Sequence, residues 1–169
     1  MRISVMDYSF SRGIKAEKID LPAMLHYLEE LGVSGVEFMD NFVDGQDLNK
    51  IQTALSKTKT KVVSYMTYCN FITPNLATRH KEVRRLRKNL NQAAILGSPL
   101  VIVVPGLSQN SIPPHLARRW ISQSLSECMS SALQLGVTLA IENLGLQTSV
   151  YGESDQLMTI CDAVGSELK

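Results

Sequence analysis

The sequence predicts an α/β fold built from parallel strand–helix repeats. Short apolar runs rich in β-forming residues alternate with amphipathic stretches, and a Leu-Gly pair closes three of those stretches. The apolar runs are continuous rather than alternating with polar residues. Strands of this kind are buried on both faces, which is typical of a parallel sheet covered by helices. The 169 residues therefore predict a single domain over 1–169.

The expected elements follow one another in five repeats. The predicted strands are residues 3–6, 35–38, 62–65, 100–104 and 138–141. The predicted helices are residues 22–31, 48–55, 83–94, 116–132 and 155–164, from apolar residues at helical spacing. Gly32, Gly97 and Gly136 each stand where a helix should stop, a position that favours positive φ. A further glycine, Gly165, closes the last helix, so we expect the chain to end as a sixth strand begins.

Two architectures fit five such repeats. A (β/α)₈ barrel takes about 250 residues, so this chain would hold about five of the eight units. A five-stranded doubly wound sheet needs no more than the length present, although residues 7–13 lack a glycine-rich phosphate-binding pattern. Because a sixth repeat is started, we predict a partial barrel, truncated at its C-terminal side, with the doubly wound sheet as the alternative.

Composition excludes several classes of protein. The chain is 44% hydrophobic and its apolar runs are strand-sized, so we expect neither disorder nor a membrane span. Its net charge of +1 provides no basic footprint and argues against nucleic acid as a partner. Cys69, Cys128 and Cys161 are too far apart for a disulfide framework or a zinc knuckle. We expect a reduced, cytoplasmic protein.

Two strands end on a glutamate. Glu142 follows Leu139-Ala140-Ile141, and Glu37 lies near the end of residues 35–38. Since strand side chains alternate between faces, each glutamate should point away from the face that packs against the helices. A carboxylate at the C-terminal end of a parallel strand stands where active sites are built. A salt bridge to a neighbouring helix is the alternative for both residues.

Aromatic residues and histidines are the other candidates. Tyr68 follows the third strand and is a candidate for stacking on and hydrogen bonding to a ligand, with core or loop packing as the alternative. His26, His80 and His115 lie in or at the starts of predicted helices, away from the strand ends, so we expect surface or helix-start roles rather than metal binding.

Three segments resemble the xylose isomerase-like TIM-barrel superfamily. They are Gly35-Val36-Glu37-Phe38 after Leu31-Gly32, Val103-Val104-Pro105-Gly106, and residues 135–143, which end in Leu139-Ala140-Ile141-Glu142-Asn143. The resemblance covers the whole chain but only the first five units of the family barrel. It implies a metal-dependent sugar or sugar-phosphate isomerase or epimerase, in which a divalent cation and carboxylates stabilise an enediolate.

The resemblance also assigns roles to individual residues. It implies that Glu142 is a catalytic residue and a ligand of a divalent metal, with Mn²⁺, Mg²⁺, Co²⁺ and Zn²⁺ all open. It implies substrate-side roles for Asn143 and Glu37. The family's other three metal ligands would lie beyond Lys169, so we expect the metal to be held weakly or not at all and this chain alone to be inactive.

Two further functions stay open. A non-catalytic half-barrel would act through a protein partner or through self-association at the open sheet edges, giving a homo-oligomer. An endonuclease IV-like DNA-repair enzyme is the other alternative. That family branch carries histidine ligands after the third and fourth strands, whereas residues 65–71 and 105–110 contain no histidine.

Overall fold

The computed structural model describes residues 2–107, 111–144 and 150–169. The strands are β1 (Ser4–Met6), β2 (Gly35–Met39), β3 (Lys61–Tyr68), β4 (Leu100–Val104) and β5 (Thr138–Ile141). The helices are η1 (Asp7–Phe10), α1 (Ser11–Lys15), α2 (Leu21–Glu30), α3 (Asp40–Val43), α4 (Leu48–Ser56), α5 (Leu76–Ile95), α6 (Pro114–Leu135) and α7 (Ser154–Val164). Each predicted strand and helix is present, and the short elements η1, α1 and α3 come in addition.

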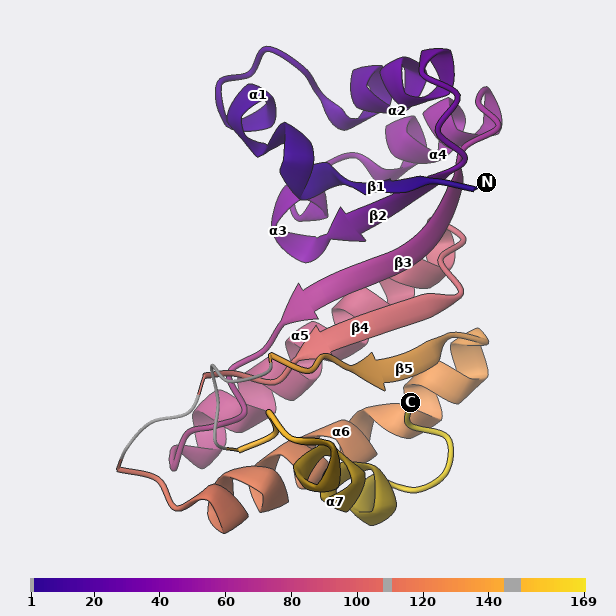
Figure 1. The fold of residues 1–169 in the computed structure, drawn as a ribbon. Helices are drawn as coiled ribbons and strands as arrows, with labels where there is room; N and C mark the ends of the chain where they lie inside the picture. The colour runs from indigo at the N-terminus through magenta and orange to yellow at the C-terminus, as the bar shows by residue number, and fades with distance from the viewer. Residues whose placement is uncertain (1, 108–110, 145–149) are drawn as a thin grey trace.

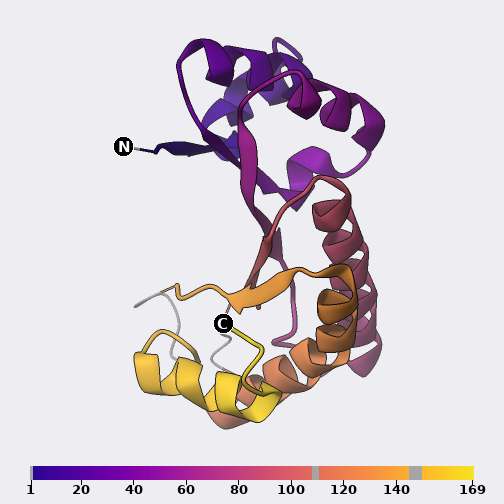
Figure 2. The same ribbon diagram turned by 90° about the vertical axis from the view of Figure 1, so that its right-hand side faces the viewer.

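All strand pairs are parallel, and the sheet order is β1-β2-β3-β4-β5. A doubly wound sheet reverses its strand order at a switch point and carries helices on both faces. Here the order is sequential, and the strands line the concave side of an arc while the helices lie on its convex side (Figures 1 and 2). The alternative of a doubly wound sheet was therefore wrong, and the partial barrel is confirmed.

The three predicted helix stops have the expected backbone. Gly32, Gly97 and Gly136 have φ of +70°, +75° and +66°, in the left-handed region that side chains avoid. In each case the next residue donates its N–H to a carbonyl five positions back, for example Val137 N to Ala132 O at 3.0 Å. This arrangement ends the helix and turns the chain directly into β2, β4 or β5.

The core lies between the sheet and its helices. Val36 and Phe38 of β2 and Val101 and Val103 of β4 are fully buried there. A β-bulge at Val36/Glu37 places Ser64 opposite Glu37 and Tyr65 opposite Phe38. The bulge thereby sends the serine to the concave face and the tyrosine into the core.

The last residue joins the sheet beside β5. Lys169 donates its N–H to Leu139 O at 3.0 Å, and Ile141 donates to Lys169 O at 2.8 Å. This pair of bonds is the parallel pattern, so Lys169 occupies a sixth strand position. No helix in the described part of the chain is long and apolar enough to cross a membrane.

Candidate functional site

Glu37 lies on the concave face of the sheet, between two serines. Its carboxylate accepts hydrogen bonds from Ser4 Oγ at 2.8 Å and from Ser64 Oγ at 3.1 Å. These serines come from the strands on either side, since Ser4 is in β1 and Ser64 is in β3. A carboxylate held from both sides has a fixed orientation. Because Val36 and Phe38 point into the core, the predicted alternation of faces in β2 is present.

Glu142 directly follows β5 at the same end of the sheet. Its N–H donates to Val103 O at 2.9 Å, which extends the β4–β5 ladder by one residue. Leu139 is buried in the core and Ile141 packs against it, so Glu142 is on the concave face by alternation. Glu142 does not belong to any of the ion pairs among the described residues. None of these ion pairs therefore ties its carboxylate to a helix. The half-buried Glu142 is followed by the exposed Asn143.

Tyr68 is the last residue of β3 and is 42% exposed, whereas Tyr65 and Phe71 are fully buried. Of the aromatic residues around this strand, Tyr68 is the one whose ring is accessible to a ligand. It lies close enough to Tyr151 to influence that residue's pKa. Tyr68 at the end of β3 and Glu142 directly after β5 both contribute to raising the pKa of Tyr151.

Tyr151 was not among the predicted site residues. Its ring is fully buried, and its hydroxyl donates to Gly106 O at 2.5 Å. Burial, Tyr68 and Glu142 together raise the pKa of Tyr151, so its hydroxyl keeps its proton at neutral pH. The bond fastens the segment before α7 to the segment after β4. Tyr151 stands outside any periodic stretch, so the sequence offered no signal for it.

Asp7 is a second residue that the prediction missed. Its side chain is fully buried at the end of β1, and Oδ2 accepts the N–H of Met39 at 3.0 Å. Oδ1 has no hydrogen-bond partner among the described groups. Burial raises the pKa of Asp7 to about 7, against the opposing effect of backbone N–H groups. The rule that singled out strand-end acids in β2 and β5 would have found Asp7 if applied to β1.

A buried polar network lies behind the strand ends, on the helix side. The Asp40 carboxylate, at the end of β2, accepts from Thr67 Oγ1 at 2.6 Å, from Arg85 Nη2 at 2.9 Å and from Asn89 Nδ2 at 3.0 Å. Thr67 belongs to β3, and the other two belong to α5. The network fixes α5 against the ends of two strands that carry candidate residues.

The described residues do not form a complete metal site. They contain no group of three or more His, Cys, Asp or Glu side chains placed to hold an ion. His26, His80 and His115 are exposed on α2, α5 and α6. Residues 108–110, part of the loop predicted to lack a histidine ligand, lie outside the described residues. Glu142 is therefore one carboxylate available to a cation rather than a binding site by itself.

Comparison with known proteins adds a family. The family model described as xylose isomerase-like TIM barrel matches residues 25–168. No curated protein matches the chain.

Solved structures match the fold with low sequence identity. D-psicose 3-epimerase with D-fructose has a TM-score of 0.83 and 15% identity, covering 100% of this chain and 62% of its own. The 3-keto-D-glucoside 4-epimerase from E. coli has a TM-score of 0.79 and 14% identity, covering 89% and 62%. The IolI protein with a bound zinc atom has a TM-score of 0.78 and 15% identity, covering 99% and 61%. The chain thus spans about three-fifths of the length of these structures.

Proposed function

Because the chain belongs to the xylose isomerase-like TIM-barrel family, we propose that it acts on a small sugar as part of an isomerase or epimerase. The observation that carries the proposal is the placement of two strand-end carboxylates, Glu37 and Glu142, on the concave face of the sheet. Two of the structural neighbours are D-psicose 3-epimerase, in the presence of D-fructose, and 3-keto-D-glucoside 4-epimerase. They indicate the chemical class to test, a small keto sugar.

The chemistry requires a proton to leave a carbon next to a carbonyl. Glu142 is the residue we assign to that step, as a carboxylate that accepts the proton and returns it. Glu37, oriented by Ser4 and Ser64, would accept hydrogen bonds from sugar hydroxyls. Tyr68 would stack on the sugar ring and Asn143 would orient it.

A divalent metal would polarise the carbonyl in this family's chemistry. Glu142 is the ligand we propose for it, with Mn²⁺, Mg²⁺, Co²⁺ and Zn²⁺ as candidates. The described residues supply too few ligands to hold such an ion tightly, so we assign no step to it. For that reason we propose that this chain by itself binds sugar better than it turns sugar over.

Exchange in D₂O tests the assignment. The protein is incubated with D-fructose, with and without Mn²⁺, and deuterium uptake next to the carbonyl is followed by NMR, alongside chemical shifts that report sugar binding. We expect saturable binding in the wild type, and any exchange to disappear in Glu142→Gln. Glu30→Gln, an exposed carboxylate on α2, is the matched control. Deuterium exchange that is unchanged in Glu142→Gln, or the absence of saturable binding of D-fructose to the wild type, would reject the proposal.

Self-association is a second candidate. In a closed barrel the first and last strands bond to their neighbours on both sides. In this sheet β1 is an outer strand, and on its outer side β5 bonds to Lys169 among the described residues. Outer strands carry backbone groups that can pair with another chain. Light scattering after gel filtration gives the mass directly, and a monomer over a range of concentrations would eliminate this candidate.

All three cysteines are free thiols, with Cys69 and Cys128 buried. This supports the proposal of a reducing, cytoplasmic location.

A further inference from the structure

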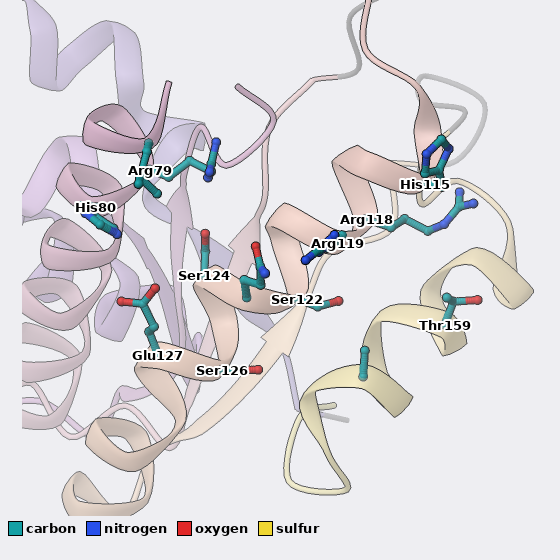
Figure 3. Close-up of a pocket in the computed structure, with 13 residues that line it drawn as sticks. Arg79, His80, His115, Arg118, Arg119, Ser122, Ser124, Ser126, Glu127 and Thr159 are labelled. Carbon is teal, nitrogen blue, oxygen red and sulfur yellow. The ribbon is translucent and has the colours of Figure 1, made fainter. Parts of the chain in front are cut away.

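A groove of about 730 Å³ lies in the helix layer, on the side of the molecule away from the concave face of the sheet. It is formed by α5, α6 and α7, and Figure 3 shows its side chains rising from these three helices. Ligand pockets commonly enclose about 300–1,000 Å³, so its volume suits a small molecule. The residues proposed for sugar chemistry do not line it.

The groove is more positive than the chain as a whole. Arg79, Arg118 and Arg119 line it together with one carboxylate, Glu127, which leaves a charge of +2 without the histidines. The entire chain has a net charge of +1. His80 and His115 add two further side chains able to donate hydrogen bonds. An anion entering the groove therefore meets a net positive charge.

Two of the arginines are held in place before any ligand binds. The Arg79 guanidinium lies 4.9 Å from the centre of the Trp120 ring and donates Nη1 to Thr73 O at 2.5 Å. Arg118 donates Nη1 to Val150 O at 3.2 Å. Each bond uses one of the five N–H donors of a guanidinium, which leaves others for a ligand. Fixing the arginines in advance lowers the entropy lost on binding.

The rest of the lining offers hydroxyl donors and apolar surface. Ser122 and Ser124 are buried in α6, and both contribute to the groove. Leu76, which is 55% exposed, and Ala163 contribute apolar side chains from α5 and α7. A ligand that matches this lining carries a dianionic group for the arginines and hydroxyls, together with an apolar part.

We propose that the groove between α5, α6 and α7 binds a small organic phosphate, a phosphate ester with an apolar substituent. Arginine recognises phosphate with paired N–H···O bonds, and serine hydroxyls donate to the same oxygens. The site is separate from the strand ends, so its occupancy does not depend on the sugar chemistry proposed above.

The fluorescence of Trp120 tests the proposal. Trp120 is the single tryptophan of the chain and contacts Arg79 at the groove, so its emission reports on this site. The probes are butyl phosphate, inorganic phosphate and butanol, which separate the whole ligand from its two halves. We expect a saturable change with butyl phosphate, weaker binding of inorganic phosphate and no change with butanol.

Two variants make the test specific. Arg119→Gln removes an exposed groove arginine, and we expect butyl phosphate to bind roughly tenfold more weakly, because a charge-assisted hydrogen bond to the phosphate is lost. Arg12→Gln, an exposed arginine on the distant α1, is the matched control and should bind as the wild type does. Circular dichroism and thermal melting show whether both variants keep the fold.

Three outcomes would overturn the proposal. They are the absence of a saturable change with butyl phosphate, equal affinity in Arg119→Gln and the wild type, and an equal loss in Arg12→Gln. Inorganic phosphate binding as tightly as butyl phosphate would overturn the assignment to an organic ester.

Discussion

Asp7 makes the stability of this protein fall as the pH rises. Its buried carboxyl has one oxygen bonded to the Met39 N–H and one without a partner among the described groups. Burial raises its pKa from an ordinary value of 3.8 to about 7. Between these two values the native state binds more protons than the unfolded chain, so unfolding free energy declines as pH increases. The stability contributed by the protonated carboxyl is fully present below about pH 3.8, and it is lost as the pH rises through about 7.

The size of the effect follows from the two pKa values. One pKa unit corresponds to about 1.4 kcal/mol, so the whole difference is worth up to about 4 kcal/mol. Roughly 3 kcal/mol of this falls between about pH 5 and pH 8, where most other carboxyls no longer titrate. Asp7→Asn has almost the same shape, keeps an oxygen for the Met39 N–H and carries no charge at any pH.

Urea unfolding, followed by Trp120 fluorescence and circular dichroism at several pH values, measures the effect. We expect the free energy of unfolding of Asp7→Asn, relative to the wild type, to rise by roughly 3 kcal/mol from about pH 5 to pH 8. Asp162→Asn, an exposed carboxyl on α7, should follow the wild-type profile. Parallel profiles for Asp7→Asn and the wild type would refute the reasoning, because they would mean that Asp7 titrates alike in both states.

Two further predictions concern other buried groups. Burial raises the pKa of Cys69 and of Cys128 to about 12, so a thiol reagent at neutral pH should label the half-buried Cys161 first. Mass spectrometry should show that this fast label is missing in Cys161→Ser. Arg85→Met leaves the buried Asp40 carboxylate without its cation, 2.9 Å away, and should cost about 3 kcal/mol of unfolding free energy in urea. Lys88→Met breaks the exposed pair with Asp44 and should cost less than about 1 kcal/mol, so equal losses in the two variants would contradict this account.

The helices and strands could be predicted from the sequence because the patterns that indicate them are local. Leu-Gly pairs closed the helices before β2, β4 and β5, and the glycines took the left-handed backbone that the pairs predicted. Alternation within β2 separated Glu37 from Val36 and Phe38 correctly, since a side chain's face follows from its position in the strand. The elements missed were η1, α1 and α3, which are too short for helical periodicity to develop.

The candidate site was only partly predictable. Glu37 and Glu142 followed from their positions at strand ends, but the serines that hold Glu37 come from two other strands, 33 and 27 residues away. A β-bulge decided that Ser64 rather than Val63 lies opposite Glu37, and the local sequence pattern of β3 did not predict this bulge. Tyr151 could not be predicted either, because its hydroxyl donates a hydrogen bond to the carbonyl of Gly106, which lies 45 residues earlier.

The sequence by itself determined the alternation of strands and helices, the faces on which the residues of β2 lie and the carboxylates at the strand ends. These properties depend on neighbours within a few residues along the chain. The tertiary structure decided the sequential strand order, the burial that raises the pKa of Asp7 and the gathering of arginines between α5, α6 and α7. Each of these depends on distance and solvent exclusion between segments far apart in sequence, which come together only when the sheet curves and the helices cover its convex side.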